Sequence, residues 1–126
     1  MERLKIRGQD AQRALDTLDE ILQDPYSVKI RDATIQRFEY TFEAFWKYAR
    51  EYLKAKQGIV ANSPKLCFRE LFSVGIIDEE RSVLFQEMTD RRNETAHTYK
   101  EEVAEKIFRE IPSFSKAMGQ TLAKLL

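Results

Sequence analysis

The residues best able to do chemistry gather in one short segment, Arg92-Asn93-Glu94-Thr95-Ala96-His97-Thr98-Tyr99, which contains the only histidine of the chain. A guanidinium binds phosphate or carboxylate through paired hydrogen bonds, and an imidazole takes up or releases a proton near neutral pH. A phenol is a weak nucleophile that can accept a transferred group. This segment is therefore the candidate site, and its candidate residues are Arg92, Asn93, His97 and Tyr99.

Arg92 continues an apolar stripe instead of a charged one. Phe85, Met88 and Arg92 are three and four residues apart, which places them on one face of a helix. A buried guanidinium needs an anionic or carbonyl partner, because an unpaired buried charge is unfavourable. That partner is either a bound phosphate or a carboxylate of another helix, such as Glu39 or Glu43. In the second case Arg92 is structural.

The places of His97 and Tyr99 also leave two interpretations open. His97 follows Arg92 by five residues, about 140° around a straight helix. The two side chains therefore diverge unless the helix ends between them or a second chain completes the site. Asn93 precedes His97 by four residues and can share its face. Otherwise His97 is a surface or capping group, and Tyr99 is either an interface aromatic or an exposed, modifiable hydroxyl.

Two long helices are predicted in the first half of the chain. The first covers about residues 4–23, and Pro25 ends it because proline disfavours helical backbone in the residue before it. The second covers about residues 28–56. Its apolar residues recur with spacings of 3, 4, 3, 4 and 3, the pattern of an inward-facing seam: Ile35, Phe38, Phe42, Phe45, Ala49 and Tyr52.

Three further helices are predicted in the second half. A short one begins behind Ser63-Pro64, which suit an N-cap and a first helical turn, and another runs from about Asp78 into the arginine pair. The last covers about residues 101–125, where Pro112 predicts a kink or a break. Together the elements predict an all-α fold, an up-and-down four-helix bundle with an additional short helix, in one domain over residues 1–126.

Composition narrows the classes of function. The 126 residues include 21 Lys plus Arg and 21 Asp plus Glu, so the formal net charge is zero and no overall field favours nucleic acid or membrane. The single cysteine, Cys67, rules out an internal disulfide, and with one histidine a structural zinc site is not expected. The glycines form no phosphate loop, and no apolar run reaches ~18 residues. We expect a cytoplasmic protein without a membrane segment and without a metal or other cofactor.

The candidate segment, taken with the second helix, resembles a known family. Arg92-x4-His97-x-Tyr99 is similar to the R-x4-H-x-Y signature of the HEPN superfamily (higher eukaryotes and prokaryotes nucleotide-binding). More narrowly, the chain resembles the nucleotidyltransferase substrate-binding protein subfamily, in matching order over almost its whole length. The segments that carry this resemblance are Ile30-Arg31-Asp32-Ala33, Ile35-Gln36-Arg37-Phe38-Glu39, Trp46-Lys47, Ser63-Pro64, Phe68-Arg69-Glu70, Arg92-Asn93 and His97-Thr98-Tyr99.

The resemblance implies a small helical bundle, commonly a homodimer, encoded beside a minimal nucleotidyltransferase for which it is the substrate-binding partner. Related pairs behave as toxin and antitoxin. There the HEPN protein is a metal-independent ribonuclease, and its nucleotidyltransferase neutralises it by adding AMP to the motif tyrosine. Carried over to this chain, the resemblance implies that Arg92 binds the scissile phosphate and His97 is the acid/base. It also implies that Asn93 is a polar helper and Tyr99 the modified hydroxyl.

Three hypotheses follow. The first is a non-catalytic partner subunit of a toxin–antitoxin nucleotidyltransferase system, with Tyr99 as an AMP acceptor. The second is a metal-independent endoribonuclease toxin, in which Arg92 and His97 from both chains of a dimer line one cleft for RNA. The third is a helical interaction module whose motif is structural. We favour the first. The chain is not expected to be a nucleotidyltransferase itself, and whether it is an enzyme depends on the second hypothesis.

Overall fold

The structure, a computed structural model, describes residues 2–126; Met1, the first residue of the predicted domain, lies outside them. The described residues form four long helices and one short one and contain no strand, so the predicted all-α fold is confirmed. A π-helical turn, Leu53–Gln57, extends the second helix, and a 3-10 turn, Thr95–His97, follows the fourth. The α-helices are α1 (Glu2–Ile21), α2 (Val28–Tyr52), α3 (Pro64–Ser73), α4 (Glu79–Glu94) and α5 (Glu101–Leu125).

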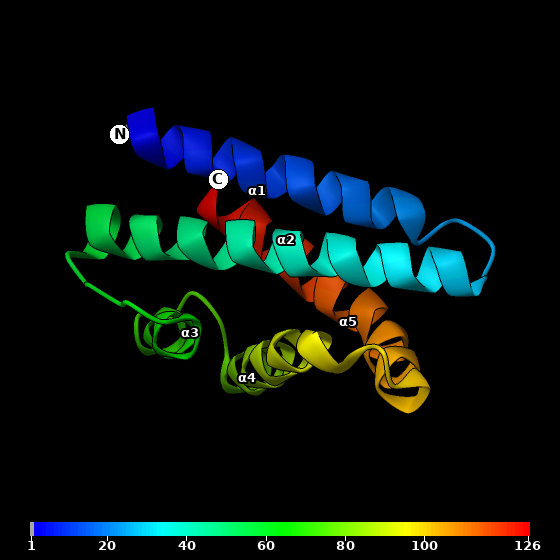
Figure 1. Ribbon diagram of the computed structural model, residues 1–126. Coiled ribbons are helices and arrows are strands. Elements are labelled where there is room, and N and C mark those ends of the chain that lie inside the picture. Colours follow the sequence, from blue (N-terminus) through cyan, green and yellow to red (C-terminus); the bar gives the residue numbers. More distant parts are fainter. Residues whose placement is uncertain (1) are drawn as a thin grey trace.

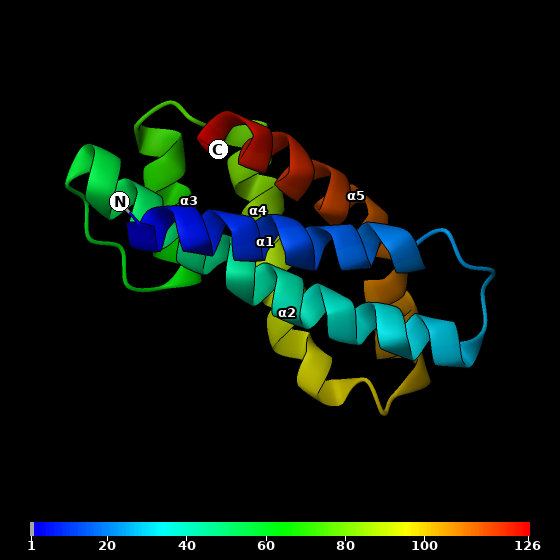
Figure 2. The same cartoon turned by 90° about the horizontal axis from the view of Figure 1, so that it is seen from above.

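The central element of the bundle is α2. In Figure 1, α1 and α2 lie side by side and run in opposite directions, while α5 passes diagonally behind α2. Figure 2, seen from above, shows α3 and α4 running across the direction of α1 and α2. Because α2 contacts each of the other four helices, it aligns the end of α4 and the start of α5 on one scaffold.

One hydrophobic core joins all five helices. The seam predicted for α2 is confirmed from Ile35 to Ala49, whose seam residues are buried, while its last residue, Tyr52, is partly buried. Within the core, the ring of Phe45 contacts Phe68 of α3 and Phe85 of α4, with centroids 5.9 and 5.3 Å apart. Such aromatic pairs add about 0.5–1.5 kcal/mol each beyond the burial of their area. They fix α4 against α2, and with it the helical part of the candidate segment.

The helix ends follow local sequence chemistry. Ser27, Ser63 and Asp78 each accept a hydrogen bond from the backbone N–H three residues on, at 3.0, 3.3 and 2.8 Å. These are N-caps, which satisfy donors that a helix cannot satisfy itself. Gly58 follows the π-helical turn with φ +68°, a left-handed conformation that glycine adopts without strain.

Of the kink or break predicted at Pro112, the break is absent. α5 is one continuous helix from Glu101 to Leu125, and Pro112 lies on its exposed side. There, water can hydrogen-bond the carbonyl that loses its helical partner, so the helix continues through the proline. Among the helices of residues 2–126, none is both long and apolar enough to cross a membrane.

Candidate functional site

The candidate segment lies where a helix changes its winding. α4 ends at Glu94, and Thr95–His97 form a tighter 3-10 turn before the chain enters α5. Thr95 is buried, and its hydroxyl donates a hydrogen bond to the carbonyl oxygen of Arg92 at 2.7 Å. The helix therefore ends between Arg92 and His97, which is one of the two conditions under which their side chains could meet.

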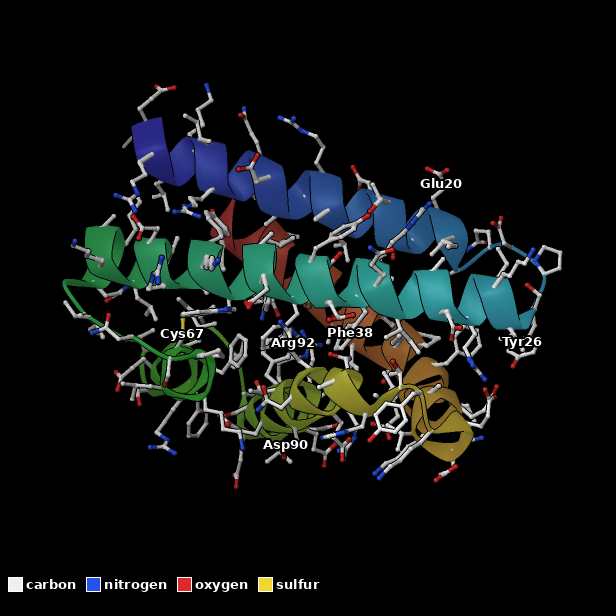
Figure 3. All side chains as sticks on the ribbon, in the orientation of Figure 1. Glu20, Tyr26, Phe38, Cys67, Asp90 and Arg92 are labelled. Atoms are coloured by element: carbon white, nitrogen blue, oxygen red, sulfur yellow. The ribbon has the colours of Figure 1, made fainter. Side chains whose placement is uncertain are left out.

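The Arg92 guanidinium lies between α2 and α4, as Figure 3 shows. Its Nη2 is 3.7 Å from Oε1 of Glu43, and its Nη1 donates to Oγ1 of Thr95 at 3.5 Å. Its Nε is buried and has no hydrogen-bond partner among the described residues. The predicted carboxylate partner is thus confirmed as Glu43, but the pairing is long and the guanidinium is only partly satisfied.

Arg92 and one face of α2 border a shallow hollow of about 370 Å³, the Arg92 hollow. Two carboxylates face one guanidinium there, so the formal charge of the hollow is negative. An arriving phosphate would meet repulsion from Glu39 and Glu43 unless Glu43 turned away from Arg92. The residues lining it are Gln36, Glu39, Tyr40, Glu43 and Arg92.

His97 is exposed, and its side chain makes no hydrogen bond within residues 2–126. A 3-10 turn rotates about 120° per residue against about 100° in an α-helix, which adds to the divergence from Arg92. No direct interaction joins the two side chains in the described part of the chain. Asn93 is exposed as well. Within one chain, the structure does not gather Arg92 and His97 into a shared phosphate site.

Tyr99 is the most exposed large hydrophobic or aromatic side chain of the described residues, at 75%. It lies in the short loop of residues 98–100, between the 3-10 turn and α5. Its ring meets the His97 ring edge-on, with centroids 6.2 Å apart, and the Lys100 ammonium lies 5.9 Å from its centroid. The side chain is therefore presented to solvent with an imidazole and a cation beside it.

The acidic residue inside the segment, Glu94, has its own partner. Arg91 donates from Nη1 to Glu94 at 2.7 Å and from Nε to Glu110 of α5 at 3.1 Å. Arg91 thus ties α4 to α5 while Arg92 faces α2, so the adjacent arginines have separate roles. The Glu94 charge is largely compensated and does not dominate the surroundings of Tyr99.

Arg31 is the residue that the sequence interpretation missed. Its side chain is 2% exposed, and it pairs with Asp32 of its own helix and with Glu101 and Glu105 of α5. Its hydrogen bonds to Glu101 and Glu105 raise the pKa of Arg31 above its usual value. A signal was available, because Arg31 precedes Ile35 by four residues and so continues the α2 seam, just as Arg92 continues the stripe of α4.

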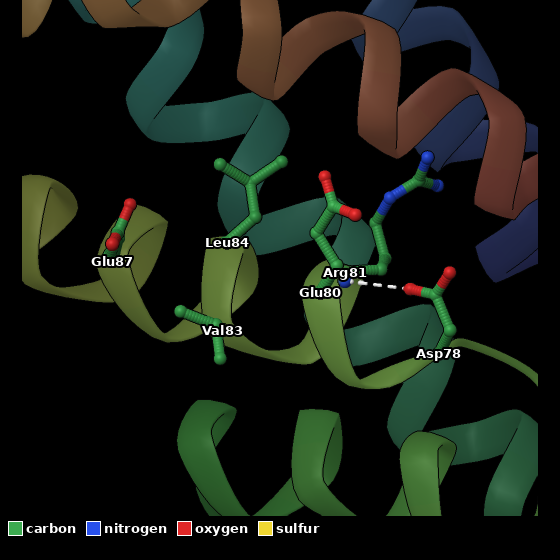
Figure 4. Close-up of a pocket in the computed structure, with 6 residues that line it drawn as sticks. All are labelled: Asp78, Glu80, Arg81, Val83, Leu84 and Glu87. Carbon is green, nitrogen blue, oxygen red and sulfur yellow. Dashed lines mark hydrogen bonds between the residues drawn. The ribbon is translucent and has the colours of Figure 1, made fainter.

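A second hollow, of about 380 Å³, lies at the start of α4 and contains none of the candidate residues (Figure 4). Arg81 extends from it toward α5, where it donates to the carbonyl oxygen of Ala117 and to Oγ1 of Thr121, both at 3.1 Å. It also donates to Oε1 of Gln120 at 2.6 Å. Because this guanidinium is occupied by helix-to-helix bonds, we interpret the hollow as a structural seam.

Cys67 belongs to the core, as its apolar neighbours predict. It is buried, and its thiol lies 3.7 Å from the carbonyl oxygen of Trp46. Burial raises the pKa of Cys67 to about 12, so the reactive thiolate is scarce at neutral pH. Among residues 2–126, no group of three or more His, Cys, Asp and Glu side chains is placed to hold a metal ion.

Comparison with known proteins identifies related chains. The family model described as "Nucleotidyltransferase substrate binding protein like" matches residues 7–126. A crystal structure of a protein from Thermus thermophilus has 47% sequence identity and a TM-score of 0.86, over 91% of this chain and 98% of that one. The comparison with curated proteins found no match.

Two more distant solved structures share the fold. A tri-AMPylated HEPN toxin from Shewanella oneidensis, in complex with its MNT antitoxin, has 16% identity and a TM-score of 0.76, over 96% of this chain and 94% of that one. A Haemophilus influenzae protein, described as revealing the fold of a substrate binding domain of a nucleotidyltransferase, has 23% identity and a TM-score of 0.62. That match covers 98% of this chain and 97% of the other.

Proposed function

Because this chain belongs to the nucleotidyltransferase substrate-binding protein family, we propose that it is the partner subunit of a two-component minimal nucleotidyltransferase system of the toxin–antitoxin type. We further propose that Tyr99 accepts AMP. The observation that carries this proposal is the presentation of Tyr99, which is 75% exposed in the loop that follows the matching Arg92 and His97. The AMPylated toxin that shares the fold supports the same chemistry.

The transfer needs an accessible phenol and a route for its proton. The Oη atom of Tyr99 would bond to the α-phosphorus of ATP held by the transferase, while the bond from that phosphorus to the bridging oxygen breaks. Pyrophosphate leaves, and the phenolic proton passes to water or to the neighbouring imidazole of His97. Lys100 lies beside the Tyr99 ring and would compensate part of the charge of the new phosphodiester.

The test is nucleotide transfer by the minimal nucleotidyltransferase that the proposal expects to be encoded beside this chain. Wild type, Tyr99→Phe and Tyr40→Phe are each incubated with that enzyme, ATP and Mg²⁺, and the modified peptide is identified by mass spectrometry. Tyr40 is the matched control, because it is also partly exposed but lies on α2. We expect AMP on wild type and on Tyr40→Phe, and none on Tyr99→Phe. Equal labelling of Tyr99→Phe, or no labelling of wild type, contradicts the proposal.

A second candidate function is favoured by the state of Arg92. Its contact with Glu43 is long and its side chain is 29% exposed, so the Nη atoms of the guanidinium retain capacity for a phosphate. Because no interaction joins Arg92 and His97 of one chain in the described residues, this second candidate uses a homodimer in which Arg92 of one chain faces His97 of the other. Such a site would cleave RNA without a metal, with His97 as the acid or base.

Complementation between chains tests the second candidate. Wild type, Arg92→Met and His97→Ala are assayed for RNA cleavage in EDTA, singly and as an equal mixture of the two variants. A site shared between chains predicts cleavage by wild type, none by either variant, and partial recovery in the mixture. Absence of cleavage by wild type, or full cleavage by His97→Ala, would remove the nuclease hypothesis and leave the partner role intact.

A further inference from the structure

The strongest unassigned cluster of charges joins the start of α2 to the start of α5. We call it the Arg31 cluster: Arg31, Asp32, Glu101 and Glu105. Nη1 of Arg31 donates to Oε2 of Glu101 at 2.6 Å and to Oε1 of Glu105 at 3.0 Å. Nη2 donates to Oε1 of Glu101 at 3.3 Å, and Nε to Oδ1 of Asp32 at 3.0 Å. Every nitrogen of this buried guanidinium therefore has an acceptor.

The cluster is attached firmly on the α2 side. Ser27 caps the helix four residues before Arg31, which fixes the backbone of the first turn. Tyr26 adds a parallel link, since its hydroxyl donates to Glu105 and its ring contacts that of Phe108 with centroids 5.5 Å apart. The contact residues of α5 are spaced by four and three along one face, so the first two turns of α5 lie against the start of α2.

The chain just before these two turns has few other restraints. Lys100 is the N-cap of α5 but makes no capping hydrogen bond through its side chain. In the loop of residues 98–100, Lys100 N–H donates to the carbonyl oxygen of His97 at 3.1 Å, and the Thr98 hydroxyl donates to the carbonyl oxygen of Thr95 at 3.2 Å. The Lys100 carbonyl oxygen accepts from the backbone N–H groups of Val103 and Ala104, both at 3.1 Å, so the loop is joined to α5 by backbone bonds. Tyr99 itself is two residues from Glu101. Outside the loop, the start of α5 is restrained by Arg31 through Glu101 and Glu105, and by burial of Ala104 and Ile107 in the core.

We infer that Arg31 is a positioning residue for Tyr99. Its bidentate hydrogen bond to Glu101 fixes the first turn of α5, and the first turn of α5 determines where the phenol of Tyr99 is presented. Arg31 is buried and does not touch the transferred nucleotide. The inference deepens the proposed function and rests on it for the AMP readout. It also makes a claim about the loop that can be measured without any transferase.

The decisive variants are Arg31→Met and Arg31→Lys. Methionine fills much of the space but makes none of the hydrogen bonds. Lysine keeps the charge but lacks the planar guanidinium group, which binds a carboxylate through two nitrogens. The matched control is Arg81→Met, because Arg81 also ties another helix to α5 through three acceptors but contacts its C-terminal half. Both methionine variants lose inter-helix bonds, and only the Arg31 variant releases the start of α5.

The first readout is AMP transfer to Tyr99, measured with folded protein well below its unfolding temperature. A displaced phenol lowers kcat by about tenfold or more, because the rate of group transfer falls steeply when a reacting atom is misplaced by a small distance. KM should stay within about twofold, since the rest of the surface is intact. Arg31→Lys should recover part of kcat, and Arg81→Met should match wild type. If Arg31→Met is modified with wild-type kcat, the inference is wrong.

The second readout is amide hydrogen exchange, which does not depend on the proposed function. In Arg31→Met the amides of residues 98–104 should exchange about tenfold faster than in wild type, while those of α3 and α4 stay unchanged. Arg81→Met should not accelerate residues 98–104. If wild type accepts no AMP but exchange changes as expected, the proposed function fails and Arg31 still orders the loop. Unchanged exchange in both Arg31 variants overturns the inference.

Discussion

Arg31 and Arg92 pack against the same helix, α2, and differ in how fully their hydrogen bonds are satisfied. Arg31 is almost fully buried, and each of its nitrogens has a carboxylate acceptor within 3.3 Å. Arg92 is 29% exposed, has one carboxylate at 3.7 Å and leaves Nε without a partner in the described residues. A saturated guanidinium has no free capacity for a ligand, whereas an undersatisfied one at the edge of a hollow retains it.

The difference arises from what each arginine faces. Arg31 meets α5 near its N-terminus, where Glu101 and Glu105 are one turn apart on the same face. Arg92 meets the middle of α2, where Glu43 is the single carboxylate of the described chain within ion-pair distance. Arginines that continue apolar stripes can thus serve two purposes. One holds the start of α5, and the other is available for binding. Four experiments test this difference between Arg31 and Arg92.

The largest effect is expected from Arg31→Met. Removing hydrogen bonds between a buried cation and its carboxylates should lower the free energy of unfolding by about 2–3 kcal/mol. The loss stays below that of a fully buried pair, because Glu101 is 71% exposed and regains water. The measurement is urea denaturation followed by circular dichroism. If Arg31→Met lowered the free energy of unfolding no more than Arg92→Met does, the proposed difference between the two arginines would be wrong.

Acid is the next most severe perturbation of the Arg31 cluster. The hydrogen bond from Arg31 lowers the pKa of Glu101, and hydrogen bonds from Tyr26 and Arg31 lower that of Glu105, below the usual 4.5. A carboxyl whose pKa is lower in the folded state stabilises the fold above its unfolded pKa, and that stabilisation is lost as pH falls. Wild type should therefore lose more stability than Arg31→Met between about pH 5 and about pH 3. Parallel pH profiles of the two proteins would contradict this.

A smaller effect is expected from Glu43→Gln, which removes the anion that competes for Arg92. We expect inorganic phosphate or a short oligouridylate to bind roughly fivefold more tightly, about 1 kcal/mol, because the anion that pairs with Arg92 is lost. Glu39→Gln is the matched control, since Glu39 lines the same hollow but makes no ion pair with Arg92. Fluorescence titration at fixed ionic strength measures both. Equal changes in the two variants would mean that the long contact with Glu43 does not restrain Arg92.

The smallest effect is expected from Arg92→Met. A partly exposed pair 3.7 Å apart contributes less than about 1 kcal/mol, so the free energy of unfolding should hardly change. This departs from the expectation for a structural motif, in which removal of Arg92 breaks a tight buried pair. A loss of about 3 kcal/mol or more in urea denaturation would show that Arg92 is structural after all.

The sequence predicted what depends on periodicity and on local chemistry. The seam of α2 from Ile35 to Ala49, the cap at Ser63 and the inward direction of Arg92 all follow from residue spacing or from the type of one residue. Each of these features depends on residues that lie close together in the sequence.

Other features depend on how distant helices cross, and spacing alone did not reveal them. The carboxylates of α5 that bind Arg31 are 70 and 74 residues away in sequence, and which of Glu39 and Glu43 pairs with Arg92 depends on where α4 meets α2. The change from α-helix to 3-10 turn between Arg92 and His97 is likewise marked by no composition signal in the segment. The roles of Arg92, Asn93, His97 and Tyr99 remain predictions for the experiments above.

The burial of Cys67 makes the protein suitable for spectroscopy with a label attached to an introduced cysteine. Because the native thiol is buried and its pKa is raised to about 12, maleimide reagents should not react with it under native conditions. A cysteine introduced at an exposed position, such as Asn93, would then carry the only label. Distances between spin labels at that position would show whether two copies of the chain bring their candidate segments together in solution.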